Sequence, residues 1–215
     1  MIFGGPVGRL GTMSQSKATR TVVLLAVISA LLAAACGPGL PTYDYAQEPD
    51  PRNQEWVLGV GDQITINVWE DPRLTTEATI RPDGTITMPL VGDLRAVGET
   101  PTALKAKVKA KVAAFVPGSE ITVALRGAHS YRLTVSGEVT RPGLLTPDFF
   151  VTVSEALAVA GGFTRFAKRN QMVLQRRDAK SGAVRTIPLA YDALISGKRP
   201  DMNIVLLTGD SLFVP

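Results

Sequence analysis

The stretch LGVGDQITINVWEDPRLTTEATIRPDGTITMPLVGDLRAVGETP, residues 58–101, decides how the folded part of the chain begins. Apolar and polar residues alternate over 64–68, which predicts a strand with one buried face. Residues 79–81 and 85–87 have strand-like sequences and flank Pro82-Asp83-Gly84. Because the proline presets a bend and the glycine tolerates its exit, this segment predicts a β-hairpin.

A helix is predicted directly after this stretch. Thr100 is a favoured N-cap residue, and Pro101 suits the first helical position. Pro117-Gly118 ends the helix. Four apolar residues recur at helical spacing and are expected to face a core: Leu104, Val108, Val112 and Phe115. Four lysines are most simply interpreted as a solvated face, with contact to an anionic partner as the alternative: Lys105, Lys107, Lys109 and Lys111.

Strand and helix patterns continue along the rest of the chain. Thr152 and Glu155 have the spacing of a capping box, and Gly161-Gly162 stops the short helix that they begin. Apolar patterning predicts further strands over 121–125, 133–135, 172–174 and 184–189. We therefore expect the α/β (α+β) class, with two small mixed domains divided near residue 128.

The N-terminal segment has the pattern of a secretion signal. Residues 22–35 form an apolar run that follows Lys17 and Arg20 and is too short to cross a hydrocarbon core of about 30 Å. Cys36 follows three alanines, and LAAAC resembles a bacterial lipobox, so we expect acyl chains such as palmitate on Cys36. The alternative is conventional cleavage that leaves a free thiol. Met13 is an alternative start, because it places both cations just ahead of the apolar run.

The segment after the cysteine is predicted to be an extended tether. Residues 37–53 contain four prolines and no apolar period. The predicted organisation is a signal peptide at 1–35, a lipidated N-terminus and tether at 36–55, a first domain at 56–128 and a second domain at 129–215.

Composition gives little support to catalysis or to nucleic-acid binding. After residue 35 the chain has 20 Lys and Arg residues against 19 Asp and Glu residues, which is no electrostatic footprint for nucleic acid. His129 is the single histidine and Cys36 the single cysteine, so neither a clustered metal site nor a histidine-activated nucleophile is indicated. We expect no enzyme activity, no metal and no cofactor.

Two residue sets carry open alternatives. Three aromatic residues could stack on sugar rings, although core packing or subunit contact is the simpler interpretation: Trp56, Trp69 and Tyr131. Three aspartates neighbour glycines and are expected to accept backbone hydrogen bonds in turns, with ligand contact as the alternative: Asp62, Asp83 and Asp210.

Two groups of motifs resemble known modules. Residues 58–101 closely resemble the polysaccharide export domain of Wza-type outer-membrane export proteins, through Gly59-x-Gly61-Asp62, Val68-Trp69, Arg81-Pro82-Asp83-Gly84 and Pro89-Leu90-x-Gly92. Residues 131–215 resemble an SLBB domain, a β-grasp-type ligand-binding module, through Val135-x-Gly137-x-Val139-x-x-Pro142-Gly143, Ala160-Gly161-Gly162, Gly209-Asp210 and Val214-Pro215.

The resemblance implies a homo-oligomeric ring at the periplasmic face of the outer membrane. Such a ring forms a conduit for capsular polysaccharide or exopolysaccharide and is coupled to an inner-membrane co-polymerase of the tyrosine-kinase type. Long members carry a C-terminal pore helix that the present sequence lacks, so we expect a short form that works with a separate outer-membrane β-barrel. The alternative function is an anchored periplasmic glycan-binding or sensing protein that forms no conduit.

The candidate site residues are therefore mostly architectural. Cys36 is the expected lipid acceptor, and Gly37 in place of the aspartate that retains lipoproteins in the inner membrane agrees with the outer membrane. The family-motif positions are expected to serve the fold or subunit contacts, with polymer contact as the alternative: Gly59, Gly61, Asp62, Trp69, Arg81, Asp83, Gly84, Gly137, Gly143, Gly161, Gly162 and Asp210.

Overall fold

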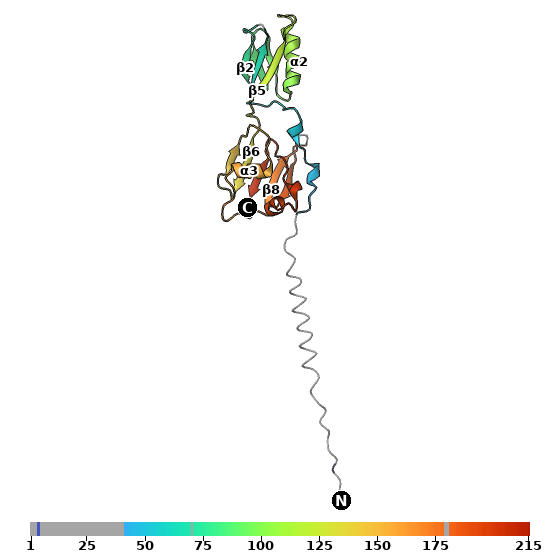
Figure 1. Ribbon diagram of the computed structural model, residues 1–215, viewed down its shortest axis with the longest axis vertical. Coiled ribbons are helices and arrows are strands. Elements are labelled where there is room, and N and C mark those ends of the chain that lie inside the picture. Colours follow the sequence, from blue (N-terminus) through green and yellow to red (C-terminus); the bar gives the residue numbers. More distant parts are fainter. Residues whose placement is uncertain (1–3, 5–40, 70, 179–180) are drawn as a thin grey trace. The chain divides into compact units, whose positions relative to one another are not determined.

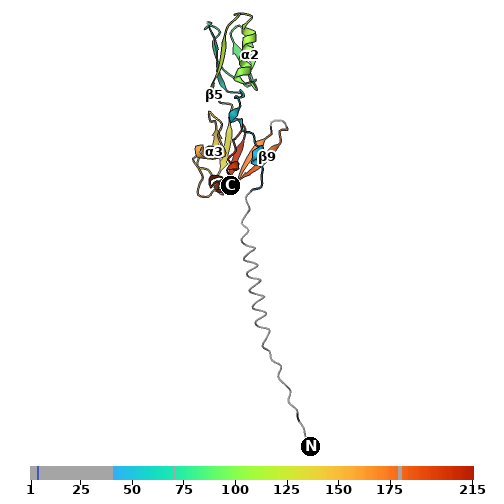
Figure 2. The ribbon, with the colours of Figure 1, turned by 45° about the vertical axis from the view of Figure 1, so that its right-hand side comes forward.

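Two hydrophobic cores organise the described part of the chain, one in each half of residues 41–215. The computed structural model describes residues 4, 41–69, 71–178 and 181–215 (Figures 1 and 2). Each core is formed by a small sheet and its helices, which confirms the expected α+β class. The predicted signal peptide, the alternative start and the acylated Cys36 lie outside the described residues.

The N-terminal half is built on a three-stranded antiparallel sheet with the order β2-β1-β5. Its strands are β1 (Gln63–Val68), β2 (Thr76–Thr79) and β5 (Ile121–Gly127). Helix α2 (Pro101–Val112) lies beside this sheet in both ribbon views (Figures 1 and 2). The apolar face of β1 packs into the same core as α2, because alternate residues of the strand point toward the helix.

The predicted hairpin around Pro82-Asp83-Gly84 is confirmed at its turn but not in the pairing of its strands. The Gly84 amide donates to the Arg81 carbonyl at 2.8 Å, and the Arg81 amide donates to the Thr85 carbonyl at 3.0 Å. Strand β2, however, pairs with β1, whereas β3 (Thr85–Met88) pairs with β4 (Gly92–Arg95). A turn sequence fixes the local bend but does not select the strand that pairs beyond it.

Helix α2 follows its sequence signals closely. The Thr100 hydroxyl accepts a hydrogen bond from the Ala103 amide at 3.2 Å, and Pro101 occupies the first turn. The residues Leu104, Val108 and Val112 are buried, as predicted. Phe115 is 51% exposed, so its predicted core position is wrong. Because the helix ends at Val112, the helical period does not determine the direction of the Phe115 side chain.

The C-terminal half is built on a five-stranded mixed sheet with the order β7-β6-β10-β8-β9. Its strands are β6 (Leu133–Gly137), β7 (Gly143–Leu145), β8 (Met172–Arg177), β9 (Val184–Leu189) and β10 (Ser211–Val214). The last strand, β10, lies in the middle, parallel to β6 and antiparallel to β8. The end of the chain therefore completes the core of this half.

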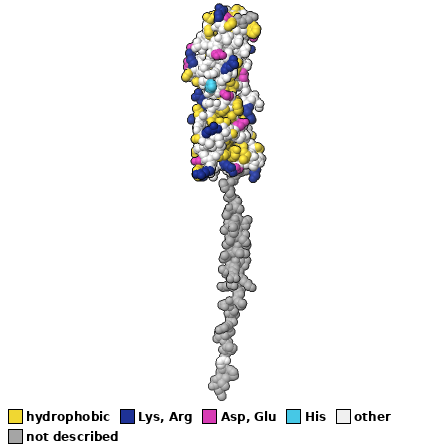
Figure 3. Space-filling model, turned by 60° about the vertical axis from the view of Figure 1, so that its left-hand side comes forward, with side chains coloured by type: hydrophobic (Ala, Val, Ile, Leu, Met, Phe, Trp, Pro, Cys, Tyr) yellow, Lys and Arg dark blue, Asp and Glu magenta, His cyan; other side chains and the backbone are white. Residues whose placement is uncertain are grey.

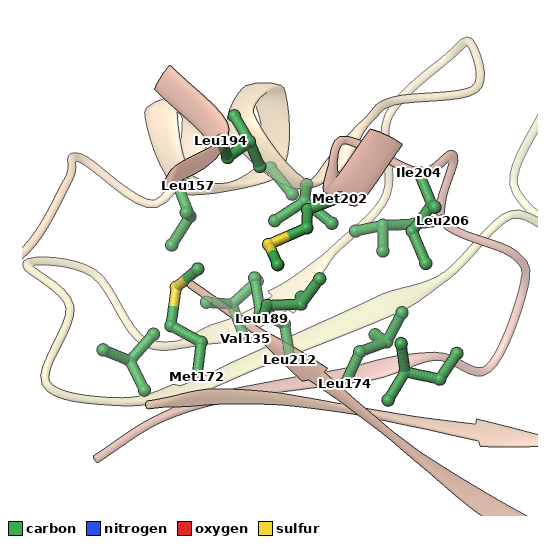
Figure 4. Close-up of a cluster of buried hydrophobic side chains, with 14 of the residues drawn as sticks. Val135, Leu157, Met172, Leu174, Leu189, Leu194, Met202, Ile204, Leu206 and Leu212 are labelled. Carbon is green, nitrogen blue, oxygen red and sulfur yellow. The ribbon is translucent and has the colours of Figure 1, made fainter. Parts of the chain in front are cut away.

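Short helical segments cover one face of this sheet. They are α3 (Val153–Val159), α4 (Tyr191–Ile195) and the 3₁₀ turn η3 (Pro200–Met202). Leu157, Leu194 and Met202 point from these segments toward Leu189 and Leu212 on the sheet (Figure 4). The predicted capping box of α3 is confirmed: the backbone and side chain of Thr152 exchange hydrogen bonds with Glu155.

Residues 41–55 correct the tether prediction. They form two 3₁₀ turns, η1 (Tyr45–Gln47) and η2 (Pro51–Asn53), and Tyr45 is 3% exposed within the C-terminal core. The Tyr45 hydroxyl donates to the Pro188 carbonyl. The prediction failed because a single aromatic residue with a partner 143 positions away leaves no local periodic pattern. Residues 36–40 lie outside the described part.

Candidate functional site

Asp62 joins the two halves of the described chain. Its side chain is fully buried and accepts four hydrogen bonds. The donors are the Trp56 indole at 3.0 Å, the Gly59 amide at 2.9 Å, the Ser130 amide at 2.6 Å and the Ser130 hydroxyl at 2.9 Å. A buried carboxylate is tolerated only when its oxygens are hydrogen-bonded, and these donors come from both sides of the junction. Asp62 thus joins the residues just before β1 to the first residues of the C-terminal half.

The two glycines of the same motif make this junction possible. A Cβ atom on Gly59 would lie 2.3 Å from the Ser130 Cβ, so a larger residue would push Ser130 away from Asp62. Gly61 has a φ of +93°, a backbone conformation that side chains other than glycine rarely adopt. The spacing Gly59-x-Gly61-Asp62 therefore serves a close approach and a turn.

An aromatic cluster packs beside the junction. Trp56 stacks on Phe150 with ring centroids 4.9 Å apart, and Tyr131 meets the Phe150 ring edge-on at 5.1 Å. The buried Tyr131 hydroxyl donates to the Leu206 carbonyl at 3.0 Å and accepts from the Val151 amide at 3.2 Å. Trp56 and Tyr131 therefore serve packing: Tyr131 is fully buried, and Phe150 stacks on the Trp56 ring.

Trp69 differs from those two aromatics because it is 67% exposed. It directly follows β1, and its amide donates to the Glu120 carbonyl ahead of β5 at 2.9 Å. Leu90, between β3 and β4, is also exposed and has a φ of +62°, which is unusual for a residue with a side chain. Together with Phe115, these residues give the N-terminal half large apolar side chains on its surface.

The Arg81-Pro82-Asp83-Gly84 motif forms an exposed, charge-balanced turn. The Arg81 guanidinium lies 3.4 Å from the Asp83 carboxylate and 3.1 Å from that of Asp93. The hydroxyl and amide of Thr85, with a smaller effect of Arg81, lower the pKa of Asp83. A Cβ atom on Gly84, whose φ is +82°, would lie 2.3 Å from the Val97 side chain. The motif therefore forms a turn that Arg81 stabilises through its ion pairs with Asp83 and Asp93.

The motif glycines of the C-terminal half have different surroundings. A Cβ atom on Gly137 would lie 2.0 Å from the Val214 carbonyl oxygen, so glycine permits the close pairing of β6 and β10. Gly161 and Gly162 have φ values of +80° and +77° and terminate α3. Gly143 begins β7 and pairs with Val135.

A buried ion network holds the other motif aspartate. Arg176 is 2% exposed; its guanidinium lies 2.6 Å from the Asp210 carboxylate and 2.7 Å from that of Glu48, and it donates to the Val205 carbonyl at 2.8 Å. Burial would lower the pKa of Arg176, but the two carboxylates outweigh burial and raise it. Arg185 reaches Glu48 from the surface at 3.1 Å.

Sequence reasoning missed Glu48 and Arg176. A signal for Arg176 exists, because Met172, Leu174 and Arg176 alternate on the buried face of β8. No signal existed for Glu48, whose partner is 128 positions away.

The structure does not gather the predicted residues into one site. Gly59, Gly61 and Asp62 meet at the junction, Arg81, Asp83 and Gly84 share a turn, and Asp210 lies in the Arg176 network. Among the described residues, no group of three His, Cys, Asp or Glu side chains could hold a metal ion. None of the helices in the described ranges has the length and apolarity that a membrane crossing requires.

The outer face of the N-terminal sheet carries a shallow polar groove of about 500 Å³. Its polar lining consists of Gln63, Thr65, Glu77, Thr79 and Arg126. Arg126 donates to the Thr65 hydroxyl at 3.1 Å. Such side chains offer donors and acceptors for hydroxyl groups, and the groove is open rather than enclosed.

Comparison with known proteins identifies two modules. Residues 50–126 match the model of the family described as polysaccharide biosynthesis/export protein, and residues 132–188 match that of the SLBB domain. The order of the modules agrees with the two cores. The chain therefore carries the domain of the polysaccharide biosynthesis/export family, whose members are transport components rather than enzymes, followed by an SLBB domain.

Several curated proteins are related to the chain over both modules. The capsule polysaccharide export protein BexD of Haemophilus influenzae is 28% identical over 72% of this chain and 42% of its own length. The EPS I polysaccharide export outer membrane protein EpsA of Ralstonia nicotianae is 25% identical over 71% and 45%, respectively. The capsule polysaccharide export outer membrane protein CtrA of Neisseria meningitidis serogroup A is 25% identical over 77% and 46%. The chain thus spans less than half the length of these relatives.

Proposed function

We propose that this protein is a periplasmic, lipid-anchored component of a conduit that exports capsular polysaccharide or exopolysaccharide across the outer membrane. The observation that carries the proposal is the export domain followed by an SLBB domain, in a chain similar to relatives named for capsule and EPS export. Relatives named as outer membrane proteins support the location. The anchor is the acyl group proposed on Cys36.

A conduit is the physical requirement of such transport. A hydrated polymer cannot cross hydrocarbon, because each polar group buried without a partner costs several kcal/mol. A closed ring of identical subunits supplies a lined passage without any catalytic residue. The exposed Trp69, Leu90 and Phe115 support contacts with neighbouring molecules. The proposed partners are further copies of the chain, an inner-membrane co-polymerase of the tyrosine-kinase type and a separate outer-membrane β-barrel.

The test is the mass of the acylated protein in mild detergent, measured by native mass spectrometry. A discrete closed oligomer supports the conduit, and loss of surface polysaccharide after deletion of the gene supports the export role. A stable monomer at all concentrations, with normal surface polysaccharide in the deletion strain, would refute the proposal. Matched complementation with the wild-type gene controls for effects on neighbouring genes.

The second candidate is an anchored glycan-binding or sensing protein that forms no conduit. The observation that favours it is the polar groove of Gln63, Thr65, Glu77, Thr79 and Arg126, which suits sugar hydroxyl groups. A monomer that binds the cognate polymer, with affinity lost in Arg126→Ala, would support this function. Unchanged binding in that variant would remove the groove as its site.

A further inference from the structure

The position at which the anchor segment reaches the folded protein is fixed by several contacts. The Arg199 guanidinium donates to the carbonyls of Pro41 and Tyr43 at 3.3 and 3.4 Å. It also lies 5.3 Å from the centre of the Tyr45 ring, and that tyrosine is buried in the C-terminal core. The buried ion pair between Glu48 and Arg176 fixes the chain a few residues further on. Pro41 is therefore held on one surface of the C-terminal half.

The length of the chain limits how far this surface can lie from the proposed anchor. Only five residue steps separate Cys36 from Pro41, and each spans at most about 3.6 Å, so the two residues lie within about 18 Å of each other. This inference rests on the proposed acylation of Cys36. With acyl chains on that cysteine, the surface around Pro41 has to lie close to lipid headgroups.

We name this the basal surface and define it by the loop 163–170 and the segment 191–199. Backbone hydrogen bonds join its parts, since the Tyr191 amide donates to the Arg169 carbonyl and the Arg199 amide to the Ala193 carbonyl. Dark blue Lys and Arg side chains lie at the lower end of the described residues, the end where Figure 1 marks the C-terminus (Figure 3).

The charges of the basal surface are unbalanced. Arg169 pairs with Asp192 at 3.1 Å, and Arg199 pairs with Asp201 just beyond the segment at 2.8 Å. Three further cations of the surface have no salt bridge among the described residues: Arg165, Lys168 and Lys198. All three are exposed. The surface therefore has cations available for anionic groups.

Large apolar side chains accompany these cations. Phe166 is 68% exposed and lies under the Arg165 guanidinium at 4.7 Å, and Ile195 at the end of α4 is 57% exposed. Exposed aromatic and aliphatic residues among lysines and arginines are typical of surfaces that enter the headgroup region of a bilayer.

We propose that the basal surface binds anionic phospholipid headgroups of the membrane that holds the anchor. Lys168 and Lys198 contact lipid phosphates, while Phe166 and Ile195 enter the boundary between headgroups and acyl chains. Combining one acylated residue with a basic patch strengthens anchoring and orients the protein. The C-terminal half then lies on the membrane by a defined face.

The test places an environment-sensitive fluorophore on the acylated protein. Ile195→Cys provides a labelling site, because the thiol of Cys36 is blocked by acylation. The control is Val184→Cys, a similarly exposed aliphatic position at the start of β9, the end of the strand that does not lead into α4. In phosphatidylcholine vesicles containing phosphatidylglycerol, we expect lipid quenchers to reduce emission at least threefold at position 195 and to leave position 184 unchanged.

Charge variants complete the test. The double variant Lys168→Gln with Lys198→Gln replaces two exposed side chains. We expect it to reduce the quenching at position 195 at least twofold in vesicles that contain phosphatidylglycerol, and to leave the quenching in neutral vesicles unchanged. If lipid quenchers do not reduce emission at position 195 of the acylated protein, or reduce it equally at position 184, the proposal that the basal surface binds lipid is wrong. Either result leaves the proposed export function intact. Equal quenching in the charge variant refutes the role of the lysines. An intact mass without acyl chains refutes the anchor in the proposed function and this inference with it.

Discussion

The two halves of the described chain each bury an aspartate that follows a glycine, and they hold it differently. Asp62 in the N-terminal half accepts hydrogen bonds from uncharged donors of Trp56, Gly59 and Ser130. Asp210 in the C-terminal half faces the guanidinium of Arg176 at 2.6 Å. The same dipeptide therefore serves two purposes: one carboxylate joins the halves, and the other helps hold the segment that contains Glu48.

The difference has energetic consequences. When a buried carboxylate that is bound only by neutral donors is removed, the groups that lose a partner are all uncharged. Removing Arg176 from the other site leaves the Asp210 carboxylate buried without a counter-ion, and leaves Glu48 with only the partly exposed Arg185. We therefore expect the C-terminal half to depend more strongly on one side chain than the junction does.

The largest effect is expected for Arg176→Met. The loss of both ion pairs of Arg176, which leaves Asp210 buried without a counter-ion, should lower the free energy of unfolding by about 3–5 kcal/mol, measured by urea denaturation. Arg185→Ala is the matched control, because Arg185 touches the same Glu48 from an exposed position and should cost less than about 1 kcal/mol. Equal losses in the two variants would show that the buried network has no special role.

A smaller effect is expected for Asp62→Ala. The loss of four hydrogen bonds should lower the free energy of unfolding by about 2–4 kcal/mol. Hydrogen exchange should become faster at the Ser130 amide and remain slow in β8, because only the junction is released. Asp83→Ala, which removes an exposed turn aspartate after a proline, should leave exchange at Ser130 unchanged. Unchanged exchange in Asp62→Ala would contradict the junction role.

Tyr131→Phe tests the packing beside the junction. The Val151 amide and the Leu206 carbonyl would each lose a partner, at a cost of about 1–2 kcal/mol. Thermal denaturation of the two proteins at neutral pH measures this difference.

The same variant has a predicted pH dependence. Burial raises the pKa of Tyr131 above 10.0, so its contribution is complete below pH 10 and declines as the pH rises through the folded-state pKa. Wild-type stability should therefore fall more steeply above pH 10 than that of Tyr131→Phe. Parallel pH profiles would argue against a buried, neutral phenol.

The smallest effect is expected for Lys109→Ala. Its ion pair with Glu120 is short, at 2.7 Å, but both side chains are largely exposed. The free energy of unfolding should change by less than about 0.5 kcal/mol, and added salt should reduce the difference further. A loss as large as that of Arg176→Met would mean that exposure does not separate the two kinds of ion pair.

Sequence patterns predicted most elements whose signals are local. The N-cap and proline of α2, the capping box of α3 and the alternating strand β1 were found from neighbouring residues. Predictions failed where the partner was distant: β2 and β3 do not pair across their turn, and Tyr45 packs far from its own segment. Of the candidate site, the motif positions were found, whereas Glu48 and Arg176 were not.

The sequence by itself determined the class of protein and the order of its two modules through motifs that resemble known domains. It also determined the positions of the turns, because propensities, caps and periodicity act over a few residues. Only the tertiary structure decided that Asp62 joins the halves and that Arg176 holds Glu48 beside Asp210. Those contacts depend on burial, since a charge is held so tightly only where water is excluded and its partners arrive from distant parts of the chain.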